Sequence, residues 1–563
     1  MMQGIKNISR SRAQESSAAI ERLYITMRHL FNRGFYKPMG VSGDTLREAL
    51  LSLRPEIYGS IAEEKAELNG LLYVIERLPV GIEQCRFINL TSDEGYSKSH
   101  FKAIVPPKRK RNCYRIDEEQ MNVEITRGRS DIYDILTHLT FIFIESQKIK
   151  NRVLIDDNGE IARDWLKLEQ IIATQEKLTL EEREQAISHI SNILARTFAE
   201  ITDIYDAFGS KAAPDRFLHI IYWLGKLAIE EGMGGPKRTV TFSTILQERL
   251  GHHIHGEIWA DNIKAVLKQN GLLERPIHII SANMHSVMNS LFAPPLLKAK
   301  FKDKTDFFIF EELSKATNGA MRDKVQETAL KNGMVYMPDT SGTNIDVQIF
   351  DTDKIDFAQT AFPTAQIGNK KPIIVVMDYA FGEQAYETID ELLKPYKEAG
   401  TKTFLNVESV SIMGKAGILE GNKGDIMIPS AHINEGTGDN YPFDNQLTLE
   451  MLQGQGIPVF EGPMVTVLGT SLQNRDLLTF FNQSTWGVIG LEMEGAYYQK
   501  AIQSASKIRK SINPNVKVRY AYYASDNPLE TGSTLASGGL GTTGVKPTYL
   551  ITIKILEQIF NIQ

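Results

Sequence analysis

The chain has 563 residues, of which 42% are hydrophobic and 23% are charged, and its formal net charge is −6. This length exceeds one ordinary core, so about three units of roughly 100–200 residues are expected. The composition excludes a fibrous or globally disordered protein, and the negative charge provides no general attraction to nucleic acid or to an anionic membrane. A small molecule is therefore the expected partner, rather than nucleic acid or a membrane.

The only thiols are Cys85 and Cys113. Two cysteines argue against a disulfide framework and fit a reducing compartment. The first residues are not followed by the apolar stretch of a signal peptide, and apolar windows such as 132–145 are shorter than the roughly 20 residues that span a bilayer. We expect a cytoplasmic protein with no metal ion or other cofactor.

Residues 1–210 are predicted to be mainly helical, because apolar residues recur at intervals of three and four and glycines are few. Thr179 and Glu182 have the spacing of a helix capping box. The helix that follows is expected to carry on one face Ile187, Ile190, Leu194, Phe198 and Ile201.

A break at 90–114 contains the basic run 108–111, Lys-Arg-Lys-Arg, directly after two prolines. Clustered basic side chains can bind phosphates. A solvated loop flanked by prolines is the preferred interpretation, and phosphate binding is the alternative.

Residues 211–366 have mixed character, with a helical pattern at 217–231 and an apolar segment at 276–280 that is predicted to form a strand. His252, His253 and His255 stand close together, but their spacing lacks the pair at i and i+4 of a helical zinc site. We expect them to lie on a polar surface.

Residues 367–563 are predicted to form an α/β domain, since apolar runs alternate with helical patterns and imply a sheet with crossover connections. The strands are expected at 372–377, 404–413, 425–429, 458–468, 487–492 and 516–524. The helices are expected at 382–397, 495–508 and 548–560.

Three segments of this domain contain residues suited to chemistry. The first is a glycine-containing turn predicted at Gly414-Lys415-Ala-Gly417, after a strand. Glycines allow positive φ and a close approach of the backbone, so such a turn can present N–H groups to phosphate or sugar oxygens.

The second segment is Leu491-Glu492-Met493-Glu494-Gly-Ala, at a strand-to-helix junction. A carboxylate such as Glu494 can accept hydrogen bonds from the two hydroxyls of a sugar diol, while Met493 offers an apolar face. Alternatively, the acidic residues occur here because a helix N-terminus favours negative charge.

The third segment is Ser525-Asp526-Asn-Pro-Leu, after an apolar run. An aspartate at the carboxyl end of a strand of an open α/β sheet lies where ligands bind. If burial raises the pKa of Asp526, this residue can protonate the leaving base of a purine nucleoside. By itself, the motif is also typical of an ordinary turn.

In this order, the three segments resemble the purine nucleoside phosphorylase and nucleosidase superfamily, and within it the AMP nucleosidase branch. The resemblance covers about 372 to the C-terminus and implies a mixed central sheet flanked by helices, and a homo-oligomer. It further implies that Met493 and Glu494 hold ribose, that Glu492 supports them, that Ser525 lies in the site and that Asp526 protonates the base.

The sequence departs from the phosphorylases of this superfamily, because the loop after the 372–377 strand lacks their phosphate-binding arginine pattern. Water is therefore the expected nucleophile. Glu383 is expected to orient that water, although it also reads as a surface residue at a helix start, and Lys415 is expected near a 5′-phosphate.

The leading hypothesis is thus hydrolysis of the N-glycosidic bond of a purine nucleotide or nucleoside. A purine nucleoside phosphorylase and a non-catalytic nucleotide sensor that signals through its helical half are the alternatives. The glycine-rich segment 537–546 is expected to form a flexible loop rather than a lid or phosphate cradle.

Overall fold

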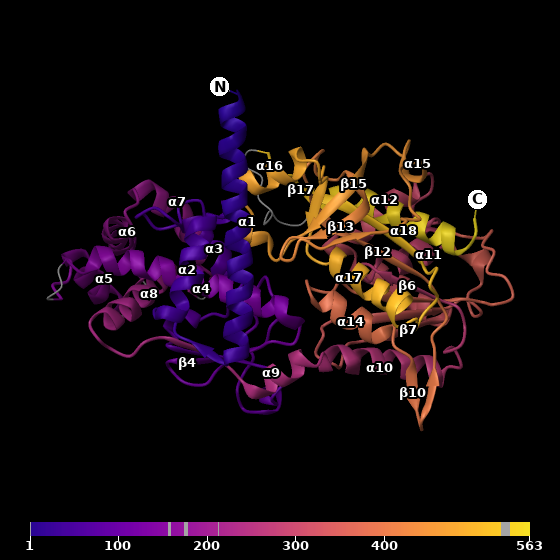
Figure 1. Cartoon of the computed structure of the whole chain (residues 1–563), viewed down its shortest axis with the longest axis horizontal. Coiled ribbons are helices and arrows are strands. Elements are labelled where there is room, and N and C mark those ends of the chain that lie inside the picture. The colour runs from indigo at the N-terminus through magenta and orange to yellow at the C-terminus, as the bar shows by residue number, and fades with distance from the viewer. Residues whose placement is uncertain (1, 156–158, 174–177, 212, 531–540, 563) are drawn as a thin grey trace. The chain divides into compact units, whose positions relative to one another are not determined.

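The chain forms two compact units in the computed structural model, which describes residues 2–155, 159–173, 178–211, 213–530 and 541–562. The N-terminal unit contains 1–126, 131–252 and 471–477. The C-terminal unit contains 127–130, 253–470 and 478–563 (Figure 1). This division differs from the three regions expected from the sequence, since the first part of the middle region joins the N-terminal unit and the rest joins the C-terminal unit.

The N-terminal unit combines helices with a small sheet. Its helices are α1 (Met2–Arg33), α2 (Val41–Leu53), α3 (Leu68–Ile75), α4 (Gly128–Val153), α5 (Arg163–Ala173), α6 (Leu180–Leu194), α7 (Phe198–Phe208), α8 (Arg216–Gly232) and α9 (Thr244–Gly251). Its strands are β1 (Phe35–Tyr36), β2 (Phe87–Thr91), β3 (Cys113–Arg115), β4 (Gln120–Glu124) and β5 (Thr239–Phe242), in the spatial order β1-β5-β2-β4-β3. A mainly helical region was predicted, and the sheet was missed because strands of two to five residues show little periodicity.

The predicted capping box is present at the start of α6. The Thr179 side chain accepts from the Glu182 amide, and the Glu182 carboxylate accepts from the Thr179 amide. The helix ends earlier than expected, because Ala195 adopts a left-handed conformation with φ of 53° and a second capping box begins at Thr197. Phe198 and Ile201 therefore belong to α7, not to the expected single face.

The basic run 108–111 is only partly solvated, since Lys108 and Lys110 are exposed while its two arginines pair with carboxylates. The Arg109 guanidinium contacts both carboxylate oxygens of Asp134, at 2.9 and 2.7 Å. Arg111 is buried and donates to Asp131 at 2.8 Å. Both aspartates belong to α4, so the two arginines hold this loop against the helix.

The C-terminal unit is built on a mixed sheet. Its strands are β6 (Ile277–Ser281), β7 (Met334–Met337), β8 (Val347–Asp351), β9 (Ile373–Met377), β12 (Val407–Ile418), β13 (Ile426–Asn434), β14 (Asn440–Pro442), β15 (Val459–Thr466), β16 (Gly490–Glu492) and β17 (Lys517–Asp526), with β10 (Tyr396–Glu398) and β11 (Thr401–Thr403) forming a separate hairpin. Its helices are α10 (Ile254–Gln269), α11 (Ser286–Leu297), α12 (Asp306–Ser314), α13 (Gly319–Lys331), α14 (Gln384–Leu392), α15 (Leu449–Leu452), α16 (Arg475–Gln483, which begins in the N-terminal unit), α17 (Gly495–Gln503) and α18 (Val545–Ile559).

Helices cover both faces of this sheet. One hydrophobic core joins the sheet to α10, α14 and α17, and a second core joins the opposite face to α11, α12, α13 and α18 (Figure 1). Strand β12 is central: it pairs in parallel with β6 and β17 and antiparallel with β16. The carboxyl ends of β6, β12 and β17 therefore meet at one edge, where ligands bind in open α/β sheets.

Most elements predicted after residue 370 are confirmed, with shifted ends. The predicted strand at 404–413 is β12, which continues to Ile418, and the predicted helix at 382–397 is the shorter α14. The strand predicted at 276–280 is β6, which lies between β12 and β9. Because β6 is an interior strand, the sheet begins well before residue 367.

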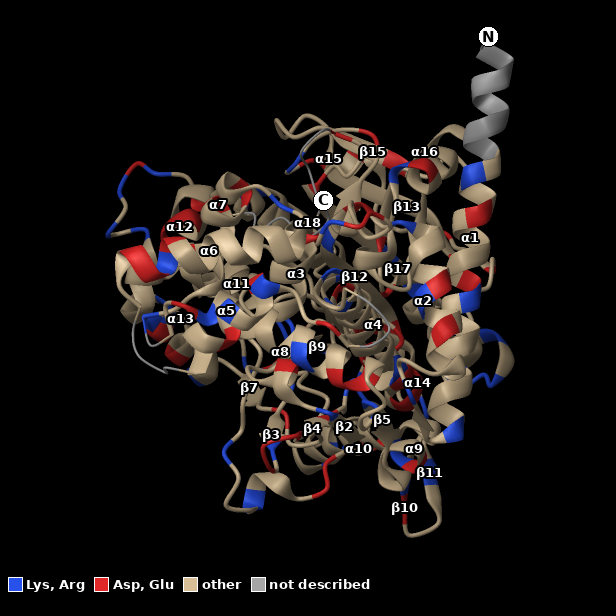
Figure 2. Ribbon diagram, turned by 90° about the vertical axis from the view of Figure 1, so that its left-hand side faces the viewer, with Lys and Arg blue, Asp and Glu red and all other residues tan. Residues whose placement is uncertain are grey.

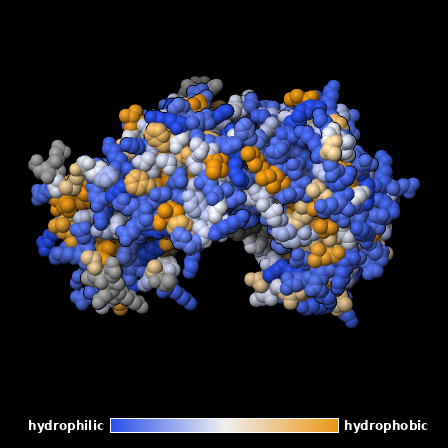
Figure 3. Space-filling model, turned by 90° about the horizontal axis from the view of Figure 1, so that it is seen from below, coloured by the Kyte–Doolittle hydropathy of each residue, from blue (hydrophilic) through white to orange (hydrophobic). Residues whose placement is uncertain are grey.

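Charged residues of both signs are interspersed along the ribbon (Figure 2). The face shown in Figure 3 is mostly hydrophilic, with hydrophobic residues in small separate groups. Among the described residues, no helix is long and apolar enough to cross a membrane. Cys85 and Cys113 are both buried free thiols.

Candidate active site

The sheet brings the three segments singled out from the sequence together. Gly417 of β12 pairs with Leu491 of β16 on one side and with Asp526 of β17 on the other. The β12–β17 register shifts at this point, since Ala416 pairs with Ala524 and Gly417 with Asp526, which leaves Ser525 as an extra residue. The pairing places Asp526 two strands from the Glu492-Met493-Glu494 segment.

The segment Gly414–Gly417 is part of β12 and is not the expected turn. Neither glycine has a positive φ, so neither is required for a left-handed conformation. The strand continues because its backbone pairs with β17 up to Gly417, and Gly417 and Ile418 also pair with β16. Lys415 is exposed between buried neighbours. Its positive charge opposes the rise that burial causes in the pKa of both Asp526 and Glu494.

Both oxygens of the Glu492 carboxylate accept hydrogen bonds from groups of the protein itself. One oxygen accepts from the Thr466 hydroxyl, and the other accepts from the backbone amides of Glu494 and Gly495 at the start of α17. His432 lies 3.5 Å from the first oxygen. Glu492 therefore fixes the beginning of α17, which agrees with a supporting role and leaves no free carboxylate oxygen for a ligand.

Glu494 is partly buried, and its Oε1 accepts from the Gly382 amide at 2.9 Å. Burial first, and then the negative charge of Glu492, raise the pKa of Glu494 to about 8, although the Gly382 and Met493 amides and the charge of Lys415 oppose the rise. Met493 is partly buried against a hydrophobic cluster that includes Leu491. Near neutral pH this carboxyl group can therefore change charge when a ligand binds.

Asp526 ends β17 and is only 4% exposed. Its Oδ1 accepts from the Ser525 hydroxyl, which also lies 3.1 Å from the Ala416 carbonyl oxygen. Its Oδ2 is buried and has no hydrogen-bond partner among the described residues. Burial raises the pKa of Asp526, although the Ser525 hydrogen bond and the charges of Lys415 and Lys423 oppose this shift.

Glu383 contacts a segment far away in the sequence. Its Oε1 lies 3.3 Å from a guanidinium nitrogen of Arg129, and its Oε2 is buried without a hydrogen-bond partner among the described residues. The expected role in orienting water stays a prediction, since these contacts neither require nor exclude it. The contacts favour an anchoring role for Glu383 at the start of α14.

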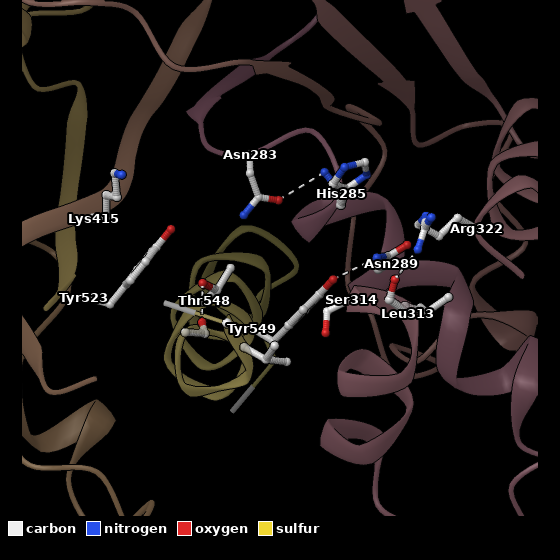
Figure 4. Close-up of a pocket in the computed structure, with 13 residues that line it drawn as sticks. Asn283, His285, Asn289, Leu313, Ser314, Arg322, Lys415, Tyr523, Thr548 and Tyr549 are labelled. Carbon is white, nitrogen blue, oxygen red and sulfur yellow. Dashed lines mark hydrogen bonds between the residues drawn. The ribbon is translucent and has the colours of Figure 1, made fainter. Parts of the chain in front are cut away.

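A cavity of about 300 Å³ adjoins Lys415 and Tyr523, which stand at corresponding positions of β12 and β17 (Figure 4). The other polar residues that line it are Asn283, His285, Asn289, Ser314, Arg322, Thr548 and Tyr549. Among the described residues, its lining contains no aspartate or glutamate. This combination of cationic, amide and hydroxyl groups suits an anionic, hydrogen-bonding ligand.

Several of these side chains are fixed in place. The Arg322 guanidinium donates to the carbonyl groups of Leu313 and Lys315 at 2.9 and 2.7 Å. Asn289 donates to the Tyr549 hydroxyl at 2.8 Å, while its Oδ1 is buried and has no partner within the described part of the chain. The cavity therefore retains an unused hydrogen-bonding atom.

Sequence reasoning missed most of this cavity lining. Asn283 and His285 directly follow β6, so their place after a predicted strand was the one available signal. Arg322 and Thr548 lie in helices with no motif. Residues 537–540 of the predicted flexible loop lie outside the described residues, while Gly541 and Gly544 line the cavity.

The cluster of histidines at 252–255 is not a polar surface throughout. His255 is buried, and its Nδ1 lies 2.8 Å from the Ser341 carbonyl oxygen. Within the ranges that the structure describes, no group of three or more His, Cys, Asp and Glu side chains is arranged to hold a metal ion.

A comparison with curated proteins gives no match. Among solved structures, a 5′-methylthioadenosine/S-adenosyl homocysteine nucleosidase from Campylobacter jejuni is 12% identical, with a TM-score of 0.31, over 51% of this chain and 100% of its own. Native futalosine hydrolase of Helicobacter pylori strain 26695 is 13% identical, with a TM-score of 0.29, over 50% of this chain and 99% of its own. Isoform 2 of uridine phosphorylase from Schistosoma mansoni is 13% identical, with a TM-score of 0.28, over 54% of this chain and 90% of its own.

The sequence as a whole matches one family, DUF6909, which is described as a family of unknown function. The match covers residues 44–302 and 298–561, and thus most of the chain. This protein therefore belongs to the DUF6909 family.

Proposed function

We propose that this protein hydrolyses the N-glycosidic bond of a purine nucleotide or nucleoside and releases the free base with ribose or ribose 5-phosphate. The observation that supports this most strongly is Asp526, a buried carboxyl group with an unpartnered oxygen at the carboxyl end of a sheet strand. Its pairing through Gly417 to the strand that leads into Glu494 supplies the second half of the site.

In the proposed reaction, the bond between C1′ of the sugar and the purine nitrogen breaks, and its electron pair leaves with the base. Protonated Asp526 gives its proton to the departing base, because an anionic purine is a poor leaving group. Water adds to C1′ and loses a proton to solvent. Glu494 accepts hydrogen bonds from the ribose hydroxyls, and its negative charge stabilises the positive charge that develops on the sugar.

The proposal is tested by incubating purified protein with AMP, adenosine and methylthioadenosine, with and without inorganic phosphate, and measuring free base by chromatography. We expect base release at the same rate in both conditions. A rate that depends on phosphate would indicate a phosphorylase. Binding of these compounds without any base release would indicate the nucleotide sensor and would contradict the proposed enzyme.

We further propose that the substrate carries a 5′-phosphate, held by Lys415 in the cationic cavity. Replacing Lys415 with alanine is expected to raise KM for AMP by about tenfold and to leave KM for adenosine unchanged, because only the nucleotide has the charge that lysine binds. Steady-state kinetics on both substrates measures this. Lys402→Ala, at an exposed position of β11, is the matched control. An equal loss for both substrates would argue against a phosphate contact.

The low cysteine content leads us to propose that the protein is cytoplasmic, and the resemblance to the phosphorylase and nucleosidase superfamily leads us to propose a homo-oligomer. Light scattering on the purified protein gives its oligomeric state directly.

A further inference from the structure

The loop Phe381–Glu383 supports the proposed ribose-binding residue. Its central Gly382 donates its backbone N–H to Glu494 Oε1 at 2.9 Å. Gly382 has a φ of 57°, a conformation that favours glycine. The direction of this N–H, and with it the hydrogen bond to Glu494, depends on what holds the loop in place.

The short segment Arg127–Ser130 contacts every residue of this loop. The Glu383 amide donates to the Ser130 hydroxyl oxygen at 2.8 Å. The Arg129 guanidinium lies 3.3 Å from Glu383 Oε1, and the Arg127 guanidinium lies 4.8 Å from the centre of the Phe381 ring. An ion pair, a hydrogen bond and a cation–π contact therefore hold Phe381 and Glu383, the two residues on either side of Gly382.

The packing between the segment and the loop leaves no room for larger residues. A Cβ atom on Gly382 would lie 2.4 Å from the Ser130 hydroxyl oxygen and 2.5 Å from its Cβ. A Cβ atom on Gly128 would lie 3.2 Å from the Gln384 amide nitrogen and 3.2 Å from Glu387 Oε1. The backbones of the segment and the loop can thus lie this close together because each has a glycine at the point of contact.

Glu387, one turn further along α14, completes the charge balance. It is 2% exposed, and its Oε1 has no hydrogen-bond partner among the described residues. Burial, reinforced by the negative charge of Glu383, raises its pKa well above the ordinary value, which favours the neutral acid. The neutral form leaves Glu383 as the carboxylate that pairs with Arg129.

We propose that Arg129 and Ser130 are positioning residues of the active site: they hold the loop Phe381–Glu383 so that the Gly382 amide points at Glu494. This inference rests on the proposed function, because Glu494 is taken as the ribose-binding group. Neither residue needs to touch the substrate.

The inference predicts a specific electrostatic effect. The Gly382 N–H lowers the pKa of Glu494, against the rise caused by burial and by Glu492. The other titratable groups that face Glu494 are Lys415, Tyr498 and Tyr522. Loss of the N–H contact should raise the pKa of Glu494 by about one unit, as expected for one hydrogen bond to a carboxylate.

The test compares Ser130→Ala, Arg129→Gln and Arg129→Lys, each with and without Glu494→Gln, in the full chain. Stability against urea is measured from pH 5 to 10. Glu494 has a higher pKa in the folded state than in the unfolded state, where it is near 4.5. Protein with Glu494 therefore loses stability relative to Glu494→Gln as pH rises from 4.5 to about 8, and at higher pH the difference in stability stays constant. We expect this difference to become constant near pH 8 with the natural residues at 129 and 130, near pH 9 in Ser130→Ala and Arg129→Gln, and in between for Arg129→Lys.

Arg152→Gln, at an exposed position near the other end of α4, is the matched control and should level off near pH 8. Levelling at the same pH in all variants, or at a lower pH in Ser130→Ala and Arg129→Gln, would overturn the inference even if their activity fell. This measurement needs no turnover, so it separates a failure of the positioning role from a failure of the proposed enzyme. With active enzyme, the same two variants should also raise KM for AMP at pH 7.

Discussion

Replacing Asp526 with asparagine is expected to reduce kcat for base release by about 10²–10⁴-fold, the range expected when a general acid is removed. Asparagine has nearly the same size and can keep the contact with Ser525, but it has no acidic proton to give to the departing purine. Single-turnover assays with AMP, followed by chromatography of free adenine, measure the chemical step without interference from product release.

Unfolding of the variant would not explain a lower kcat, because Asp526→Asn is expected to increase the free energy of unfolding rather than to decrease it. Burial raises the pKa of Asp526, so the folded protein loses stability as pH rises above the ordinary pKa of an aspartate, and an asparagine avoids this loss. The variant should therefore be at least as stable as the natural protein at pH 7. Asp444→Asn, at an exposed position, is the matched control. Unchanged kcat in Asp526→Asn would exclude this residue as the acid.

The second large effect concerns the pH dependence of binding at Glu494. The Asp526→Asn protein is suited to this measurement, because it should bind AMP without cleaving it. Burial first, and then Glu492, place the pKa of Glu494 at about 8, so its carboxyl group is mostly neutral below that pH. Ribose hydroxyls bind an ionised carboxylate more strongly than a neutral acid, so the affinity for AMP should increase as pH rises to about 8 and then stay constant.

Adding Glu494→Gln to this protein should remove the increase and weaken AMP binding by about 10–100-fold at pH 9, where the natural carboxylate is ionised. At pH 6 the two proteins should differ much less, because a neutral glutamic acid and a glutamine then present similar groups. Calorimetric titration with AMP gives both affinities, and Glu461→Gln, at an exposed position of β15, is the control. A pH profile of AMP affinity that Glu494→Gln leaves unchanged would contradict ribose binding at this residue.

The sequence was most informative where local patterns decide the structure. Strands β9, β13, β15 and β17 are apolar runs bounded by polar or turn residues, so their periodicity predicts them. The extent of the sheet was not predictable in this way. Strand β6 lies between β12 and β9 although more than 90 residues separate it from either, and no local pattern encodes that pairing.

The same limit applies to the candidate site. Asp526 and Glu494 occur in segments with a motif, and they were identified on that basis. Arg129 and Ser130 meet Glu383 across more than 250 residues of sequence, and Arg322 reaches the cavity from the middle of the chain. The ion pair of Glu383 with Arg129 is likewise formed only in the folded chain, so no local pattern predicts it.

The unmatched serine between Ala524 and Asp526 is an extra residue in β17, where two residues stand opposite one of β12. Such an irregularity bends the strand locally and changes the direction of the side chains beside it. Deleting that serine would remove the irregularity and the hydroxyl that donates to Asp526 Oδ1, so the acid would lose both its backbone geometry and its one hydrogen-bond donor among the described residues. Spacing at the end of β17 is thus as strict a requirement for this protein as the identity of residue 526.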